Sequence, residues 1–272
     1  MKAPEAADPP FEVVPASHPG RRPIVAHIPH ASRRIPPGIR SSIVLSDVDL
    51  ERELVALTDA HTDDLFAWLG DHGATRFVNR RSRLVVDPER LLDPSAEPTE
   101  LLGQGAVYTR TSDGRALRTS DPVAREALIE AFYRPYHDAL DATATDLVEA
   151  FGTCTLLDCH SFPTVPLPSE LDQAPDRPDI CIGRDPLHTP DELAEPLADA
   201  FRAAGLSVSV DRPFAGTMVP GAFFGHDTRL RSVMIEVRRG LYMDEATGDR
   251  SPDYVATRAL LERSVVSSGI LD

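Results

Sequence analysis

The chain has 272 residues, and its 28 Lys and Arg against 43 Asp and Glu give a formal net charge of −15 at pH 7. This acidity excludes nucleic acids and anionic membrane surfaces as partners, because both require a positively charged protein surface. A hydrophobic content of 42% is enough for a packed core, and the length suits one large domain. If the substrate is a small anion, a local group of arginines must offset the repulsion from the negative net charge of the protein.

The sequence predicts a protein of the cytoplasm. No stretch is apolar over the roughly 18 residues that a membrane span needs. The first residues contain acids and no apolar core, which is atypical of a signal peptide. Three cysteines, Cys154, Cys159 and Cys181, form no C-x-x-C pair, and an odd count of this kind favours reduced thiols.

Short apolar runs alternate with helical patterns after a polar, proline-rich lead-in over residues 1–21. The apolar runs predict buried strands at 22–28, 75–78, 84–86, 155–158, 179–182, 206–210 and 232–237. Apolar residues at helical spacing predict helices at 46–57, 60–70, 121–151, 190–204 and 252–267. The alternation predicts an α/β fold, with a single domain over 22–272 in which helices cover both faces of a mixed, mostly parallel sheet.

Residues 88–121 interrupt this alternation with prolines, glycines and charged residues of weak periodicity. We expect a long, flap-like excursion there, with a hairpin around residues 112–114. Excursions of this length inside a compact domain are usually functional or mobile.

Three side chains with catalytic chemistry lie at or near the ends of predicted strands: His30, His160 and Glu236. Ligands of open α/β sheets bind beyond the carboxyl ends of the strands. Neutral imidazole is a common zinc ligand, so both histidines are candidate metal ligands. The alternative is that each is a loop histidine that only forms hydrogen bonds.

Glu236 lies inside an otherwise apolar run. An acid in such a place is costly to bury unless it is paired or functional. It is therefore either the general base of a metal-assisted hydrolysis or the partner of Arg238 or another arginine in a buried ion pair.

A catalytic zinc ion usually has a third protein ligand. No Glu follows His30 at the His-x-x-Glu spacing, so this ligand must come from elsewhere. Segment 59–64 contains Asp59, His61 and Asp63 where one helical pattern ends and another begins. The alternative is that these residues only cap the second helix.

Arginines gather after the predicted strand at 75–78, namely Arg80, Arg81, Arg83 and Arg90. Because arginine binds carboxylates through two parallel hydrogen bonds, this group is a candidate clamp for an acidic substrate. The alternative is a solvated basic turn paired with surface acids.

Two further positions admit a functional and a plain interpretation. Asp158 lies two residues before His160, where it either orients that histidine from behind or merely ends the strand. Gly216 belongs to a Pro-Phe-Ala-Gly loop, where glycine lets the backbone approach a ligand, although an ordinary turn explains it as well.

Seven short motifs occur in one order along the chain: PHAS (29–32), DAHTD (59–63), SRLVVD (82–87), LDCHS (157–161), RPDICIG (177–183), PFAG (213–216) and IEVR (235–238). Through this ordered set, over about residues 22–245, the chain resembles the N-formylglutamate amidohydrolase (deformylase) family, a relative of the zinc carboxypeptidases.

The resemblance implies a three-layer α/β/α fold of the zinc-carboxypeptidase type with one zinc ion at the strand ends. His30 and His160 would be metal ligands, with Asp63 as the preferred carboxylate ligand and Asp59 as the next choice. His61 also stays open, and other divalent metals suit such a site. Glu236 matches the catalytic acid position.

The resemblance also implies hydrolysis of a linear amide in a small acidic N-acyl amino acid. With N-formyl-L-glutamate the products would be formate and L-glutamate, as in the last step of one route of histidine degradation. Arg83 matches the family's Ser-Arg motif and would act beside Glu236 as a carboxylate clamp. Arg80, Arg90 and Gly216 are further substrate-binding candidates.

Two other functions remain open from the sequence. One is a different zinc amidohydrolase or carboxypeptidase that acts on another N-acyl amino acid or a peptide. The other is a non-catalytic protein that binds a small acidic ligand through the arginines. The sequence leaves the oligomeric state undetermined.

Overall fold

The central feature of the structure, a computed structural model that describes residues 9–17 and 20–272, is one seven-stranded sheet with strand order β1-β3-β2-β4-β7-β5-β6. Its strands are β1 (Phe11–Val14), β2 (Ile24–Ile28), β3 (Thr75–Asn79), β4 (Cys154–Phe162), β5 (Ile180–Gly183), β6 (Val208–Val210) and β7 (Leu230–Arg238). Four of the six neighbouring pairs run parallel, whereas β1 runs antiparallel to β3 and β5 antiparallel to β7. The predicted mixed, mostly parallel sheet is therefore confirmed.

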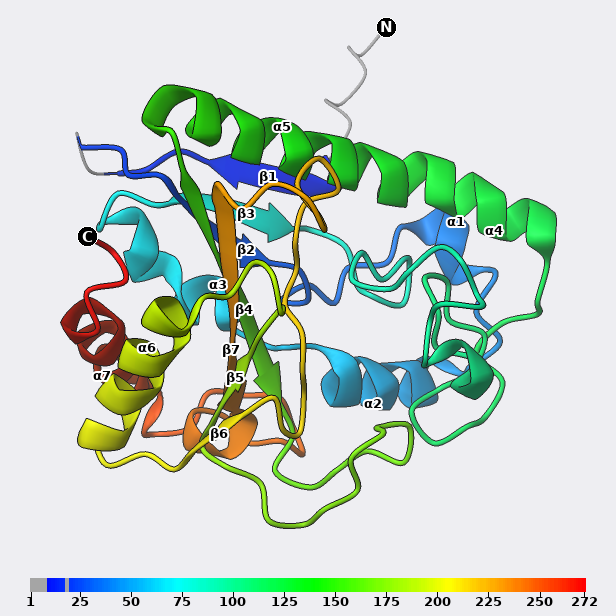
Figure 1. Cartoon of the computed structure of the whole chain (residues 1–272). Coiled ribbons are helices and arrows are strands. Elements are labelled where there is room, and N and C mark those ends of the chain that lie inside the picture. The colour runs from blue at the N-terminus through cyan, green and yellow to red at the C-terminus, as the bar shows by residue number, and fades with distance from the viewer. Residues whose placement is uncertain (1–8, 18–19) are drawn as a thin grey trace, which may run out of the picture.

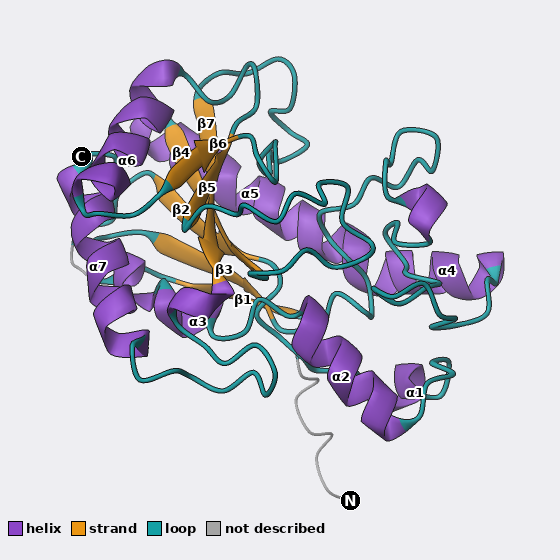
Figure 2. Cartoon of the chain, turned by 90° about the horizontal axis from the view of Figure 1, so that it is seen from below, coloured by secondary structure: helices purple, strands orange, loops and turns teal. Residues whose placement is uncertain are grey.

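Helices cover both faces of the sheet, which confirms the three-layer α/β/α arrangement. They are α1 (Pro37–Arg40), α2 (Asp47–Leu57), α3 (Thr62–Leu65), α4 (Pro122–Leu128), α5 (Arg134–Phe151), α6 (Asp191–Ala203) and α7 (Tyr254–Ser267). Figures 1 and 2 show α5 along one face, with α6 and α7 on the other. None of the helices in the described ranges is both long and apolar enough to span a membrane.

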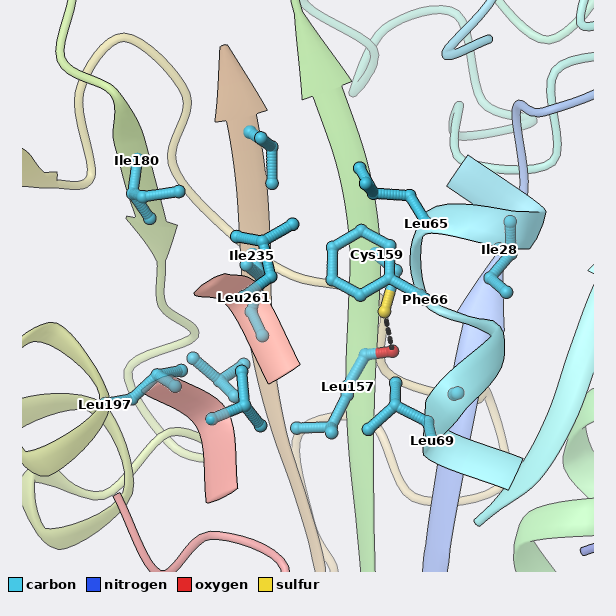
Figure 3. Packing of buried hydrophobic residues seen from close by; sticks show 14 of the residues in the cluster. Ile28, Leu65, Phe66, Leu69, Leu157, Cys159, Ile180, Leu197, Ile235 and Leu261 are labelled. Carbon is cyan, nitrogen blue, oxygen red and sulfur yellow. Dashed lines mark hydrogen bonds between the residues drawn. The ribbon is translucent and has the colours of Figure 1, made fainter. Parts of the chain in front are cut away.

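Alternate residues of the strands fill two separate cores. Leu156 of β4 packs with α5 on one face, and Leu157 packs with α3, α6 and α7 on the other. Figure 3 shows the second core, where Leu157 and Ile235 lie near Leu197 of α6 and Leu261 of α7. This alternation is the period of two that a strand covered on both faces requires.

The long helix predicted over 121–151 is interrupted by one π-helical turn at Ile129–Tyr133. Its start is as expected, since the Asp121 carboxylate accepts hydrogen bonds from the backbone N–H groups of Val123 and Ala124. Pro135 follows the π turn and lacks an N–H, so the carbonyl four residues earlier loses its α-helical donor.

Three predicted boundaries were wrong. The lead-in contains β1, where Phe11 stacks on Phe77 of β3 with ring centroids 5.2 Å apart; residues 1–8 and 18–19 of that lead-in lie outside the described residues. Residues 84–86 form buried turns rather than a strand. β4 continues past Asp158 to Phe162 because β7 pairs with it along this whole length, so His160 lies inside the strand.

The excursion at 88–121 packs against the domain through its own apolar residues. Tyr108 and Leu117 are buried in a cluster with Leu50 and Leu54 of α2. An antiparallel bridge between Arg110 and Ala116 closes the hairpin expected around 112–114. The segment thereby forms one wall beside the carboxyl ends of the strands.

Candidate active site

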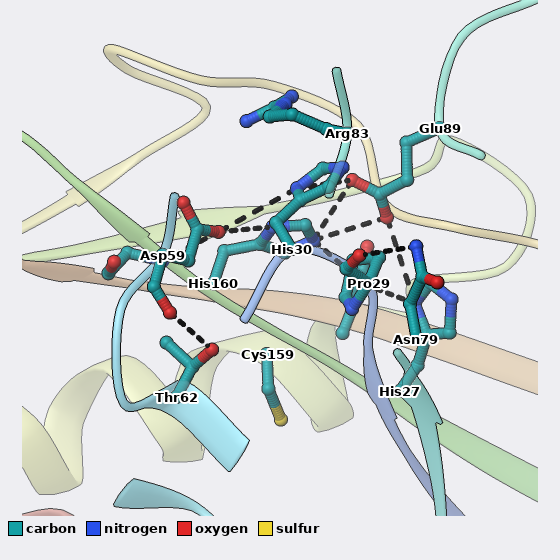
Figure 4. A network of polar contacts seen from close by, with 12 residues as sticks. His27, Pro29, His30, Asp59, Thr62, Asn79, Arg83, Glu89, Cys159 and His160 are labelled. Carbon is teal, nitrogen blue, oxygen red and sulfur yellow. Dashed lines mark hydrogen bonds and ion pairs between the residues drawn. The ribbon is translucent and has the colours of Figure 1, made fainter. Parts of the chain in front are cut away.

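His30, His160 and Glu236 line a single cavity of about 750 Å³. His30 follows β2 by two residues, and His160 of β4 is the register partner of Glu236 on β7. The ring centroids of the two histidines are 5.1 Å apart. Figure 4 shows the two rings side by side, with Asp59 on one side of them and Glu89 on the other.

Asp59 lies between the Nδ1 atoms of the two histidines. Its Oδ2 is 3.2 Å from Nδ1 of His160 and 3.7 Å from Nδ1 of His30, and its backbone N–H donates to the His30 carbonyl. Arg239 donates to its Oδ1 at 2.9 Å. Burial by itself raises the pKa of Asp59, but the two nearby histidines and the Arg239 charge outweigh it and hold the pKa well below its usual range.

The opposite nitrogens of both rings face buried carboxylates. Nε2 of His30 is 2.8 Å from Oδ1 of Asp87, and Nε2 of His160 is 2.9 Å from Oδ1 of Asp158. Burial opposes ionisation of both acids, yet neighbouring arginine and histidine charges hold their pKa values well below the usual range. Ionised carboxylates only accept hydrogen bonds, so Nε2 of each ring donates to one of these acids, while Nδ1 of each ring faces Asp59. Burial opposes the charged form of His160, but the carboxylates around it raise its pKa well above the usual range.

This arrangement suits a divalent cation. Nδ1 of His30 has no hydrogen-bond partner among the described residues, although its side chain is only 2% exposed. Glu89 adds a second carboxylate, 3.8 Å from this atom and 3.1 Å from Nε2 of His160. His30, His160 and Glu89 place three ligand atoms within 4.8 Å of one another, and two imidazoles with one carboxylate match the ligand sets of catalytic zinc sites. Asp59 is a second candidate for the carboxylate ligand, since its Oδ2 lies near Nδ1 of both rings.

The other candidates for a third ligand lie away from the histidine pair. Asp63 has a side chain that is 38% exposed and forms an ion pair with Arg80. The ring of His61 donates to the carbonyl of Gly248 at 2.9 Å. The structure thus brings Asp59 to the histidines rather than the preferred Asp63, because Asp59 precedes α3 whereas Asp63 lies in its first turn.

Glu236 is buried and does not form the ion pair with Arg238 that the sequence left open. Its Oε2 has no hydrogen-bond partner among the described residues, and Arg238 pairs with Asp179 instead. Burial raises the pKa of Glu236 to about 8. A carboxyl group with these properties at a cavity wall is suited to proton transfer.

The arginine group divides into three environments. Arg83 lines the cavity, but its Nε and Nη2 donate to Oδ2 of Asp87 at 3.1 and 2.7 Å. Arg90 also lines the cavity, with its Nε 3.8 Å from the same oxygen and without a hydrogen-bond partner in the described chain. Arg80 pairs with Glu12 and Asp63 and does not line the cavity.

Two more predicted positions lie close to this region. Gly216 lines the cavity with φ at 87°, a left-handed conformation that favours glycine. Arg81 is buried, and its Nη1 donates to the carbonyl of Arg80. Gly216 therefore remains a substrate-binding candidate, whereas Arg81 has a local structural contact.

A buried hydrogen-bond chain behind His160 was missed by the sequence analysis. The Tyr136 hydroxyl donates to Nε2 of His27 at 2.6 Å, and Nδ1–H of His27 donates to Asp158 at 2.7 Å. The signal that could have revealed it is a histidine inside a fully buried strand, since β2 and β4 place His27 opposite Asp158. These hydrogen bonds from Tyr136 through His27 hold the Asp158 carboxylate in the position from which it orients His160.

Tyr136→Phe is expected to lower the free energy of unfolding by about 1–3 kcal/mol, because it leaves the buried Nε2 of His27 without a partner. Urea unfolding measures the change. Tyr133→Phe is the control, since the Tyr133 hydroxyl bonds only the Arg90 carbonyl in a less buried place. An unchanged midpoint in Tyr136→Phe would argue against the hydrogen-bond chain.

Known proteins resemble this chain over most of its length. A family model described as N-formylglutamate amidohydrolase matches residues 22–243. The chain belongs to the N-formylglutamate amidohydrolase family. It is 27% identical over 245 residues to an N-formylglutamate deformylase of Pseudomonas putida, a match that covers 84% of each chain. A deformylase of the same name from Pseudomonas aeruginosa is 27% identical over 259 residues, covering 91% of this chain and 93% of the relative.

Two solved structures of similar length share the fold. The crystal structure of N-formylglutamate amidohydrolase from Ralstonia eutropha JMP134 aligns with a TM-score of 0.82 at 24% identity, covering 96% of this chain and 97% of that one. A gene product from Agrobacterium tumefaciens aligns with a TM-score of 0.71 at 23% identity and covers 96% of each chain. At these identities the likeness shows the fold alone.

Proposed function

We propose that this chain is a metal-dependent amidohydrolase that hydrolyses N-formyl-L-glutamate to formate and L-glutamate. The observation that carries the proposal is the cavity in which His30, His160, Asp59 and Glu236 lie together. Membership of the N-formylglutamate amidohydrolase family and the names of the two Pseudomonas relatives support the substrate. In the reaction, the hydroxyl of water adds to the acyl carbon, the C–N bond breaks, and the nitrogen gains a proton.

We assign the metal ligands to His30, His160 and Asp59. The unpartnered Nδ1 of His30 and the ionised Asp59 carboxylate support this set. A mixture of imidazole and carboxylate donors favours zinc, although other divalent metals accept it. When bound, such an ion would supply Lewis-acid polarisation of the substrate carbonyl and lower the pKa of water.

Glu236 is the general base in this proposal. With a pKa of about 8 its carboxyl group holds a proton at pH 7, and a cation bound nearby would favour the ionised form. In that form the free Oε2 accepts a proton from the attacking water and returns it to the leaving amine. Because Glu236 is buried, water is largely excluded around it, which strengthens its electrostatic contacts with substrate. Arg239 holds Asp59 in place from the side opposite the histidines.

Arg90 is the residue that holds a substrate carboxylate in this proposal. Its guanidinium is the least committed of the three cavity arginines, since Arg83 is bonded to Asp87 and Arg239 to Asp59. Arg83 instead stabilises Asp87, which in turn orients His30. The carboxylates that line the cavity outnumber its arginines, so capture of an acidic substrate depends on Arg90 and a bound cation.

Arg90→Ala is expected to raise KM for N-formyl-L-glutamate by about 10- to 100-fold, the effect of losing one charged hydrogen bond of roughly 1.5–3 kcal/mol. Initial-rate kinetics measure the change. Arg80→Ala is the matched control and should leave KM unchanged, because Arg80 bonds Glu12 and Asp63 outside the cavity. Equal effects of the two variants would reject the role of Arg90.

The proposed function is tested by formate release from N-formyl-L-glutamate with purified protein supplied with zinc. We expect stoichiometric formate and L-glutamate. The absence of formate with zinc, manganese, iron and cobalt would refute the proposed substrate.

A further inference from the structure

The cavity is larger than N-formyl-L-glutamate requires. It encloses about 750 Å³, and pockets of roughly 300–1,000 Å³ commonly surround drug-sized ligands. A single amino acid with a one-carbon acyl group leaves much of this space unfilled. The walls of the remaining space therefore indicate what else the substrate carries.

One wall is apolar and held in place by an arginine. The rings of Phe162 and Phe214 meet edge to face with centroids 5.8 Å apart, and the Arg177 guanidinium lies 5.7 Å from each centroid. Arg177 also donates to the carbonyl of Asp172 and pairs with Glu170, the two neighbours of Leu171. Phe162, Phe214 and Leu171, here called the apolar wall, all line the cavity.

Leu171 has little to cover it in the free protein. It is 69% exposed, although it lines the cavity and the adjoining backbone is held by Arg177. A fixed, exposed leucine at the mouth of a binding cavity is a typical contact for an apolar ligand group.

Phe214 of the apolar wall and Arg90 lie on opposite sides of the histidine pair in the order of the strands. The Phe214 carbonyl accepts a hydrogen bond from Cys181 of β5, and Cys181 is the register partner of Glu236. Arg90 belongs to the segment after β3, on the far side of β2 and β4 in the strand order. A substrate with its carboxylate at Arg90 and its amide at Glu236 would direct its acyl group towards the apolar wall.

We propose that the enzyme hydrolyses N-acyl-L-glutamates whose acyl chain is longer than formyl, with the chain seated on the apolar wall. This inference rests on the proposed function, since it uses the same metal ligands, Glu236 and Arg90. Each methylene that leaves water against Phe214 and Leu171 should raise kcat/KM on the order of fourfold.

The test compares kcat/KM for N-acetyl-, N-butanoyl- and N-hexanoyl-L-glutamate with the zinc-loaded enzyme, with N-formyl-L-glutamate as the reference for activity. The series is read from acetyl upward because a formyl carbonyl is intrinsically more reactive. We expect kcat/KM to rise at least tenfold from acetyl to hexanoyl. A flat or falling series would overturn the proposal.

Leu171→Ser locates the effect. The substituted side chain is exposed, so folding should be preserved, and kcat/KM should fall several-fold for the hexanoyl substrate, with a smaller fall for the acetyl substrate. Val165→Ser is the matched control, because Val165 is 72% exposed in the same segment but does not line the cavity. Equal losses for both acyl chains, or equal losses in both variants, would contradict a role of the apolar wall.

Two outcomes separate this inference from the proposed function. If no N-acyl-glutamate is cleaved, N-formyl-L-glutamate included, the proposed function itself fails. If N-formyl-L-glutamate is cleaved but N-formyl-L-glutamyl-glycine is preferred over N-hexanoyl-L-glutamate, the extra space serves the leaving group and only the acyl-chain inference fails.

Discussion

Glu236→Gln is expected to lower kcat for N-formyl-L-glutamate by about 10²- to 10⁴-fold, the usual contribution of a general base. The amide keeps the size of the carboxyl group but cannot accept the proton of the attacking water. Because Oε2 of Glu236 makes no hydrogen bond among the described residues, no structural contact is lost with the charge. Initial-rate kinetics measure the fall in kcat.

The interpretation of that variant depends on two companion measurements. Its metal content and its unfolding midpoint should match the wild type, which separates lost chemistry from lost structure. Glu262→Gln on α7 is the control for removing one negative charge, since Glu262 pairs with His72 away from the cavity. Full hydrolytic activity in Glu236→Gln would defeat the assignment of the base.

Asp59→Asn is expected to weaken metal binding by more than about 100-fold, because even residues that only support ligands typically change affinity by 10- to 100-fold. Asp63→Asn is the control, because it removes the same charge from a more exposed side chain four residues further along the chain. It should retain the wild-type metal content. Mass-spectrometric metal analysis after dialysis measures both.

Glu89→Gln completes this comparison. Glu89 lies near both histidines, so it is the rival carboxylate for the metal. We expect Glu89→Gln to keep its metal, since Asp59 is the acid that faces the Nδ1 atoms of both rings. Loss of metal in Glu89→Gln with retention in Asp59→Asn would reverse the ligand assignment.

The sequence was most informative where chemistry follows directly from the strand pattern. Apolar runs indicated β2, β4 and β7, and these three strands carry or precede His30, His160 and Glu236. The position of Asp158 behind His160 was also visible, because residues two apart in a strand point to the same face. His160 and Glu236 lie side by side because the hydrogen-bonded register of β4 and β7 pairs these two residues.

The side chains that come from connecting segments could not be placed in the same way. The sequence showed Asp59 and Asp63 together but not which way each points, and the start of α3 turns only Asp63 towards Arg80. Glu89 reaches the histidines because residues 84–86 form a turn instead of the predicted strand. The arginine group was also visible in the sequence. Which of these arginines line the cavity and which lie at the surface depends on the acids that pair with each one, and the sequence does not show these pairs.

The central claim is that hydrolysis depends on a cation held by His30, His160 and Asp59, and it is tested most directly by removing and restoring that cation. The enzyme is stripped with a chelator, its metal content is measured, and formate release from N-formyl-L-glutamate is followed before and after zinc is added back. We predict about one ion per chain before stripping, loss of activity with the ion, and recovery of both with zinc. Full activity in metal-free protein would contradict the account.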